Sequence, residues 1–378
     1  MDRPRRLLFV FGTRPEAIKL APVIAMAKRE KDRFETRVAV TAQHRGMLDD
    51  VLGIFGIRPD ADLDLMRPGQ SLFYLTSAIV REMEEVLGRF GPDVVIVQGD
   101  TTTAFTAALA GFYAHKKVAH VEAGLRSGDK TMPFPEEINR RLVSSVADYH
   151  FAPTDSARRN LLKEGVPDGN VHVTGNTVID ALLGVLEQHP ADGPCPIDEP
   201  ASIFATYERV ILITGHRREN FGPPFQAIWT ALAASARNNA GVAFVYPVHP
   251  NPSVTDRVRR VLKDLPNCFL LPPLPYPAFC WCMARCYLIV TDSGGIQEEA
   301  PALGKPVLVT RRVTERPEAA AAGMVKLVGD DGGAIQSWIQ RLLDDPDCYA
   351  KMAKGGSPYG DGRAAERILN ILNNVDLP

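Results

Sequence analysis

The sequence has no long apolar run and no excess of charge of one sign. No window approaches the ~18 apolar residues that a membrane-spanning helix needs. The first apolar run, residues 7–11, is shorter than the ~7–15-residue apolar core of a secretory signal. The 43 Lys and Arg against 45 Asp and Glu give a net charge of −2. We therefore expect no membrane partner and no nucleic-acid partner, because the chain has no general field that attracts an anionic surface.

Cysteine is scarce, and its spacing does not suggest a metal site. Of the six cysteines, three cluster in CWCMARC, residues 280–286. No second cysteine pair or histidine stands at metal-ligand spacing from them. We interpret the cysteines as buried, reduced thiols, and we expect no bound metal and a cytoplasmic location.

Several motifs of common enzyme classes are also absent. The first strand is not followed by GxGxxG, which argues against a dinucleotide cofactor. The sequence also lacks GxxxxGK[ST], GxSxG and HExxH. These absences argue against ATP hydrolysis, esterase chemistry and zinc hydrolysis, so we expect no cofactor.

Short β-branched runs alternate with longer amphipathic stretches along the whole chain. This alternation is typical of βαβ units and predicts an α/β fold with parallel sheets. The runs form two series, which predict two Rossmann-like lobes. The expected strands are 7–11, 36–41, 93–98, 117–121, 149–154 and 170–175 in the first series, and 209–214, 241–247, 268–271, 286–291, 306–310 and 325–328 in the second. The clearest helical patterns are 16–30, 71–90, 102–114, 136–147 and 223–239.

The domain boundary is expected in a Pro-rich stretch without periodicity, HPADGPCPIDEP. We therefore predict four segments. They are an N-terminal lobe at 1–175, a linker region at 176–207, a C-terminal lobe at 208–360, and a final helix at 361–378 that caps the second lobe or returns to the first.

Unusual polar residues follow almost every predicted strand. The first lobe has GTRPEAIK, AQHR, GDTTT and EAGLRSG at these places, and the second has GHRREN, VHPNP, DSGGIQEE and RRVTERPEA. Ligands of open α/β sheets bind outside the carboxyl ends of the strands. The pattern predicts a deep polar cleft between the two lobes.

The stretch TDSGGIQEEA, residues 291–300, has the clearest signal for an anion. A strand runs into Ser293, Gly294 and Gly295 and then into a helix, whose first N–H groups and dipole attract negative charge. Glu298 or Glu299, one turn further, is placed to accept a hydrogen bond from a ribose hydroxyl. The alternative is a plain tight turn with a helix cap.

Other candidates in the two lobes are cations and acids. Arg14 and Lys19 could reach an anion, or be solvated charges at a helix start. His216 and the arginines after it suggest phosphate or leaving-group chemistry, with a capping cluster as the alternative. The acids that follow strands or begin a helix in the first lobe are Asp100, Glu122 and Glu136. Any one of them could be a helix cap, but three converging acids suggest proton transfer.

Taken together, the motifs resemble those of the non-hydrolysing UDP-N-acetylglucosamine 2-epimerases. The motifs that carry the resemblance, in the family's order over residues 7–372, are FGTRPEAIKLAPVI, VTAQHRGML, QGDTTTAF, HVEAGLRS, PFPEEINR, TGNTVIDAL, TGHRRENFG, YPVHPNP, TDSGGIQEEAPALGKPVL and TERPEA. The resemblance implies the GT-B fold, in which a nucleotide-sugar cleft lies between two Rossmann-like lobes. It also implies a cytoplasmic homodimer that takes a UDP-sugar and works without NAD or metal.

The resemblance implies a specific reaction and site. UDP leaves C1 of UDP-N-acetylglucosamine as the C2 proton is lost, which gives 2-acetamidoglucal, and re-addition yields UDP-N-acetylmannosamine. The residues that match the family's catalytic positions are Asp100, Glu122, Glu136 and His216. Those that match its UDP contacts are Arg14, Lys19, Phe279, Ser293, Gly294, Gly295, Glu299 and Arg316. Which acid serves which face of C2 stays open.

Some positions depart from the family pattern. Gln98 stands where many members have His, two residues before Asp100. In some members a second substrate molecule activates the enzyme, and the positions that match the lining of that site are Gln43, Gln70 and His249. Gly46 and Gly69 replace a Gln and an Arg of the strongly activated members, which argues against such activation here.

Three alternative functions stay open from the sequence. The first is the same epimerisation of a modified sugar, such as a UDP-2,3-diacetamido-uronic acid. The second is a GT-B glycosyltransferase, which would need an acceptor groove or an apolar membrane-facing patch. The third is a non-catalytic regulator that binds nucleotide sugars, although it would have no use for the three acids together.

Overall fold

The computed structural model describes all residues except 1–2, 44, 68, 216–221, 249–251 and 375–378. The chain forms two compact units, residues 1–181 with 359–378 and residues 182–358. The chain passes from the first unit to the second within helix α7, Thr177–Gln188. No described helix is long and apolar enough to cross a bilayer.

Unit 1 contains a seven-stranded, fully parallel sheet with the order β3-β2-β1-β4-β5-β6-β7. Its strands are Arg5–Phe11 (β1), Phe34–Val40 (β2), Ala61–Asp62 (β3), Val94–Gln98 (β4), Lys117–Val121 (β5), Tyr149–Ala152 (β6) and Val171–Val173 (β7). Its other helices are Arg14–Arg29 (α1), Arg45–Ile54 (α2), Leu72–Phe90 (α3), Thr102–Tyr113 (α4), Glu136–Val146 (α5), Asp155–Lys163 (α6), the short 3₁₀ turn Asp168–Asn170 (η1) and Ala364–Asn373 (α16).

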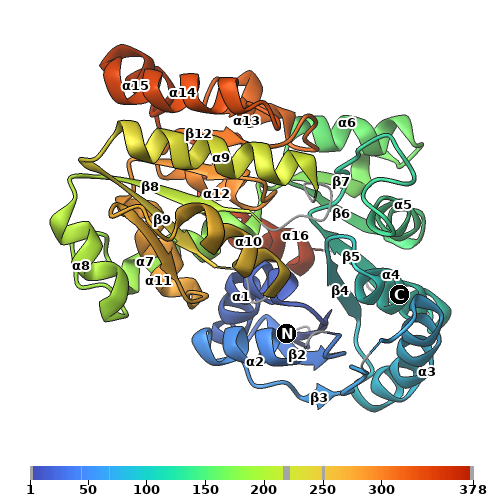
Figure 1. Ribbon diagram of the computed structural model, residues 1–378. Coiled ribbons are helices and arrows are strands. Elements are labelled where there is room, and N and C mark those ends of the chain that lie inside the picture. Colours follow the sequence, from blue (N-terminus) through green and yellow to red (C-terminus); the bar gives the residue numbers. More distant parts are fainter. Residues whose placement is uncertain (1–2, 44, 68, 216–221, 249–251, 375–378) are drawn as a thin grey trace. The chain divides into compact units, whose positions relative to one another are not determined.

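Helices cover both faces of this sheet, which is why its strands are apolar on both sides. Helices α3, α4 and α5 pack side by side on one face, and α1 and α2 cover the other (Figure 1). Helix α16, at the red end of the colour scale, packs against the blue α1 in Figure 1. The backbone N–H groups of Ala364 and Ala365, at the start of α16, donate to the Asp180 carboxylate at 3.2 and 2.8 Å.

Unit 2 contains a six-stranded parallel sheet with the order β10-β9-β8-β11-β12-β13. Its strands are Arg209–Thr214 (β8), Val242–Pro247 (β9), Cys268–Leu271 (β10), Leu288–Thr291 (β11), Val307–Val309 (β12) and Val325–Leu327 (β13). Its described helices are Asp198–Thr206 (α8), Pro223–Asn238 (α9), Pro252–Leu262 (α10), Tyr276–Arg285 (α11), Ile296–Ala302 (α12), Pro317–Ala321 (α13), Gly332–Asp344 (α14) and Pro346–Met352 (α15).

Both strand orders reverse direction at one point, between β1 and β4 in unit 1 and between β8 and β11 in unit 2. At such a switch point the loops from the two neighbouring strands run to opposite faces, which opens a crevice at the carboxyl edge. The α/β prediction with two Rossmann-like sheets is therefore confirmed. Each switch point is the place where a ligand is expected.

The predicted elements agree closely with the observed ones, with two differences. The helical patterns 71–90, 102–114 and 136–147 correspond to α3, α4 and α5 within one residue at each end. The region 176–207, expected as a linker, contains the helices α7 and α8. The two-residue strand β3 was not anticipated, because two residues carry no periodicity.

At the opposite, amino edge of the unit 1 sheet, a buried carboxylate pairs with two partly exposed arginines. Asp93, just before β4, accepts hydrogen bonds from the Arg3 guanidinium at 2.8 Å and from the Arg6 backbone N–H at 2.9 Å. Burial works to raise the pKa of Asp93, but the hydrogen bonds from Arg3 and Arg6 outweigh it and lower the pKa to about 2. The ionised carboxylate thus stabilises the folded chain.

This pKa predicts how stability depends on pH. Because the folded pKa lies below the ordinary 3.8, the contribution is complete above pH ~4 and is lost as the pH falls through about 2. We expect Asp93→Asn to lower the free energy of unfolding by about 1–2 kcal/mol at pH 7. Urea unfolding of both proteins should show this difference shrinking below pH 4, and the exposed Asp32→Asn is the control for the loss of one carboxylate at pH 7. A difference that is constant down to pH 2.5 would contradict the assignment.

Candidate functional site

The carboxyl edge of the unit 1 sheet gathers the three predicted acids onto elements that touch one another. Asp100 follows β4, Glu122 follows the neighbouring β5, and Glu136 is the first residue of α5. Glu122 has a positive φ of 65°, so the chain turns sharply directly after the strand. Parallel strands end at the same edge, and this puts the residues after β4 and β5 side by side.

Asp100 is held by the helix that begins with Glu136. The Arg140 guanidinium donates to the Asp100 carboxylate in a close ion pair, and the Asn139 amide donates to the Asp100 carbonyl oxygen at 3.0 Å. Residues three and four positions apart share one helix face, so Glu136, Asn139 and Arg140 point the same way. The Asp100 side chain remains partly exposed at 28%, which leaves it accessible to a ligand.

Glu122 is held by two other elements of unit 1. Its carboxylate accepts from the Lys19 ammonium of α1 in a close ion pair and from the Asn176 amide at 2.8 Å. Glu122 is buried, with a side-chain exposure of 6%. Lys19, expected as a UDP contact, therefore lies against a predicted catalytic acid, whereas Arg14 at the start of α1 is exposed.

Three side chains near these acids were not recognised as functional candidates from the sequence. The His120 ring lies against the Gly99 carbonyl oxygen at 2.7 Å, directly before Asp100. Burial lowers the pKa of His120 to about 3, so its ring is neutral at pH 7. The others are Arg140 and Asn176, which stand in the quoted motifs PFPEEINR and TGNTVIDAL. Arg140 could have been found from the sequence, because a residue four positions after Glu136 lies on the same face of a helix.

Gln98, which departs from the family pattern, is the last residue of β4 and is buried at 2% exposure. Its amide nitrogen has no hydrogen-bond partner among the described residues.

Two of the predicted activator residues are in contact. The Gln70 side-chain amide donates to the backbone carbonyl oxygen of Gln43 at 3.2 Å. The Gln43 side-chain oxygen accepts from the Thr103 hydroxyl at 3.0 Å.

In unit 2 the predicted anion loop follows β11, at the switch point with β8. Ser293, Gly294 and Gly295 connect β11 to the seven-residue helix α12. The Ser293 N–H donates to the Thr291 hydroxyl at 2.9 Å, which fixes the start of the turn. His216 and His249, predicted after β8 and β9, lie outside the described residues.

Arg316 lies directly over this loop. Its guanidinium donates to the buried Glu298 carboxylate and to Glu315. A Cβ on Gly294 would lie 2.6 Å from the Arg316 Nη1 atom. Gly294 is therefore needed so that the arginine can approach the loop backbone.

Glu299 and Phe279 complete the predicted set. Glu299 is buried, and its carboxylate accepts from the Tyr276 hydroxyl at 2.7 Å. Burial, with the neighbouring Glu299 charge, raises the pKa of Tyr276 well above its ordinary value, so the hydroxyl keeps its proton. Tyr276 begins α11, and the half-buried Phe279 is one turn further on the same helix.

The two sheets define the class of this protein. Two Rossmann-like units, each with a strand-order reversal and a polar carboxyl edge, are characteristic of GT-B nucleotide-sugar proteins. The family model described as UDP-N-acetylglucosamine 2-epimerase matches residues 26–373. The Yersinia pestis protein named UDP-N-acetylglucosamine 2-epimerase is 52% identical over 98% of this chain and 98% of its own length. The chain therefore belongs to the UDP-N-acetylglucosamine 2-epimerase family.

Solved structures agree with this assignment. The Neisseria meningitidis UDP-GlcNAc 2-epimerase bound to UDP-GlcNAc is 46% identical, with a TM-score of 0.89, covering 97% of this chain and 99% of that one. The S. aureus MnaA-UDP co-structure is 41% identical, with a TM-score of 0.90 and 99% coverage of both chains. The fold expected from the resemblance is thus confirmed.

The Gly294–Arg316 contact predicts different effects of alanine at two adjacent glycines. Gly294→Ala should lower the free energy of unfolding by about 1–3 kcal/mol, because the buried Arg316 must move away from its carboxylates. Gly295→Ala is the matched comparison. A Cβ there would lie 3.6 Å from the Glu299 Oε2 atom, which is ordinary contact, and the backbone of Gly295 is already helical, so we expect little change. Denaturant unfolding of both variants checks this, and equal stabilities would contradict it.

Proposed function

We propose that this protein interconverts UDP-N-acetylglucosamine and UDP-N-acetylmannosamine by elimination and re-addition of UDP. The observation that carries the proposal is the arrangement of acids in unit 1. Asp100 and Glu122 follow adjacent strands, and the helix that begins with Glu136 supplies the two side chains that hold Asp100. Inversion at C2 needs one group to remove a proton from one face and another to deliver a proton to the other face.

In the first half-reaction, a carboxylate takes the C2 proton, the C1–O bond breaks, and its electron pair leaves with UDP. The sugar is left as 2-acetamidoglucal with a C1–C2 double bond. In the second half-reaction a carboxylic acid protonates C2 from the opposite face and the UDP oxygen bonds to C1 again. We assign these proton transfers to Asp100, Glu122 and Glu136. Their separate anchoring, Asp100 by Arg140 and Glu122 by Lys19 and Asn176, suits groups that must act from different directions.

The departing UDP needs donors and cations, because negative charge grows on its diphosphate. In this proposal unit 2 binds UDP through Ser293, Gly294, Gly295 and Arg316, with Glu299 on the ribose and Phe279 beside the uracil. His216, Arg14 and Lys19 act on the diphosphate as it leaves. The hydrogen bond from Tyr276 fixes the Glu299 carboxylate, so a ribose hydroxyl would meet an acceptor already held in place.

The activator residues belong to the same proposal. Gln43 and Gln70 of unit 1 match two positions that line the activator site of some relatives, and the third match, His249, belongs to unit 2 and lies outside the described residues. A side chain at Gly46 or Gly69 would meet open space, since no atom lies within 4 Å of a Cβ built there. A side chain would fit at Gly46, whereas Gly69 has a φ of 68°, which side chains rarely adopt, so a polar residue there would need a different backbone. Glycine at both positions leaves this chain with fewer groups to hold an activator.

Isotope exchange tests the reaction. With UDP-N-acetylglucosamine in D₂O and no NAD, we expect deuterium at C2 of the recovered sugar nucleotides and formation of the mannosamine epimer. In the same assay Asp100→Asn, Glu122→Gln and Glu136→Gln should each lower turnover about 100-fold or more, while calorimetry shows that UDP binding is retained. Wild-type protein that keeps protium at C2 and forms no epimer would reject the reaction, and near-normal turnover in two variants would reject the assignment. A panel of UDP-sugars, with free UDP quantified, then defines the sugar.

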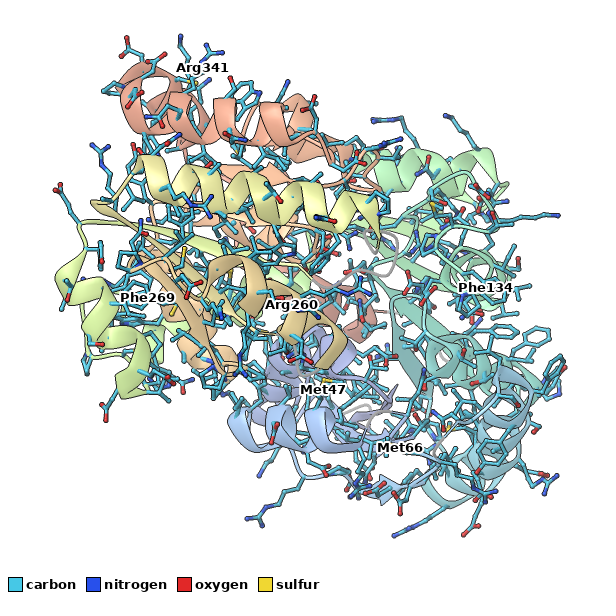
Figure 2. The ribbon with its side chains drawn as sticks, in the orientation of Figure 1. Met47, Met66, Phe134, Arg260, Phe269 and Arg341 are labelled. Carbon is cyan, nitrogen blue, oxygen red and sulfur yellow. The ribbon has the colours of Figure 1, made fainter. Side chains whose placement is uncertain are left out.

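We further propose that the protein works as a homodimer in the cytoplasm, where its six free cysteines stay reduced. Support for the dimer comes from large apolar side chains exposed on adjacent elements of unit 1. They lie on α3, α4 and α5 and directly before α5, and include Phe73, Phe112, Tyr113, Phe134, Ile138 and Leu142. Figure 2 labels Phe134 among the side chains of unit 1, and its exposure is 70%. Large apolar side chains exposed on neighbouring helices are typical of an interface.

Light scattering after gel filtration tests the dimer. We expect a mass near twice the 41.4 kDa of one chain, and we expect Phe112→Asp to shift the mass to that of one chain, because a charge would be desolvated in the interface. Val313→Asp is the matched control, since Val313 is an exposed apolar residue of unit 2. A wild-type mass of one chain, or a dimer that Phe112→Asp leaves intact, would contradict the proposed surface.

A further inference from the structure

Glu16 is a buried carboxyl group at the switch point of unit 1 that the mechanism above does not use. It is 1% exposed, and both of its oxygens accept hydrogen bonds. Oε2 accepts from the Gly12 N–H at 3.1 Å and from the Thr13 hydroxyl at 2.7 Å, and Oε1 accepts from the Thr101 hydroxyl at 2.7 Å. A glutamate three residues after a helix N-cap ordinarily bonds only to its own helix start. The Thr101 contact crosses to a segment 85 residues away.

The two segments that Glu16 joins are the loops after β1 and β4, the neighbouring strands at which the sheet order reverses. The first loop runs directly into Arg14, and the second holds Asp100 next to Thr101. Thr101 also caps α4, because its hydroxyl accepts from the Ala104 N–H at 3.0 Å. Glu16 therefore connects the cation-bearing loop to the acid-bearing loop.

The surroundings leave little room for these loops to shift. A Cβ on Gly12 would lie 2.1 Å from the Thr41 hydroxyl oxygen and 2.6 Å from that of Thr103, and those two hydroxyls are 2.9 Å apart. Burial raises the pKa of Glu16 to about 7, although hydrogen bonds from Thr101, Thr13 and Gly12 act to lower it. An exposed glutamate could cap the helix without this desolvation, so capping alone does not account for the arrangement.

From this geometry, and resting on the proposed function, we propose that Glu16 is a positioning residue for the epimerisation. Its carboxylate sets the distance between the loop that carries Arg14 and the loop that carries Asp100. Elimination requires the proton acceptor at C2 and the cation at the leaving group to be correctly placed at the same moment. A displacement of about 1 Å between such groups is enough to lower the rate 100-fold.

Glu16→Gln tests the inference with a side chain of the same shape. An amide has only one accepting oxygen, so its NH₂ must face either the Gly12 N–H or the Thr101 hydroxyl. If the NH₂ faces Gly12, two N–H donors oppose each other; if it faces Thr101, the hydroxyl must accept from it and the Thr101 proton loses its acceptor. Either arrangement therefore weakens the contact between the two loops. We expect kcat to fall about 10-fold or more, the KM for UDP-N-acetylglucosamine to stay within about threefold, and the Tm to stay within a few degrees.

Thr101 variants test the other end of the contact. Thr101→Val removes the hydroxyl and should lower kcat to a similar degree, whereas Thr101→Ser keeps the hydroxyl and should retain activity within about threefold. The double variant Glu16→Gln/Thr101→Val should lose no more than the more impaired single variant, because both remove one contact. The comparison of Thr101→Val with Thr101→Ser still tests the inference if a Glu16 variant fails to fold.

Thr154→Val is the matched control for the loss of a helix cap. Thr154 follows β6, and its hydroxyl accepts from the Ala157 N–H at 3.1 Å as the N-cap of α6. We expect it to lower the Tm without the selective loss of kcat. The inference is overturned if folded Glu16→Gln keeps full kcat, if Thr101→Ser is as impaired as Thr101→Val, or if Thr154→Val lowers kcat equally. Wild-type protein without C2 exchange would instead reject the proposed function itself.

Discussion

The reversal of strand order in each parallel sheet is the constraint on which the rest of this structure depends. Every loop that leaves a carboxyl edge must cross to one face or the other, and only at the reversal do two neighbouring loops diverge. In unit 1 the diverging loops follow β1 and β4, and they are joined again by the Glu16 carboxylate. A polar crevice at this point therefore follows from topology, while its dimensions are set by a few buried hydrogen bonds.

The loops at the strand-order reversal carry different residues in the two units. In unit 1 the loops carry acids, and each predicted acid with described partners is anchored by a cation or an amide from another element. In unit 2 the loop after β11 carries glycines, and the Arg316 guanidinium lies over Gly294. Proton transfer needs carboxyl groups with fixed directions, whereas a diphosphate needs donors that can approach it closely. The chemistry of each unit therefore matches the side chains at its switch point.

Much of this architecture could be predicted from the sequence, because strand and helix periods are local properties. The apolar runs before Asp100 and Glu122 predicted two strands, and a parallel arrangement puts the residues after them at one edge of the sheet. What could not be predicted were contacts between distant segments. In the sequence, Glu16 resembles any acidic residue in the first turn of a helix, and nothing local reveals its bond to Thr101. The glycine at 294 suggested a close approach by a ligand, whereas the nearest atoms belong to Arg316.

The pairing of Arg316 bears on how this chain would recognise a diphosphate. Glu298 and Glu315 hold its guanidinium, and Arg311 donates to Glu315 at 2.9 Å, so two cations and two carboxylates share the cluster. Such a cluster has little net charge, in keeping with a chain whose overall net charge is −2. Attraction by a general positive field is therefore a weak basis for recognition. Donors whose orientation is fixed before the ligand arrives lose less conformational freedom on binding. In the proposed function, affinity for UDP thus arises from hydrogen-bond donors that are already correctly oriented, and not from the net positive charge of the site.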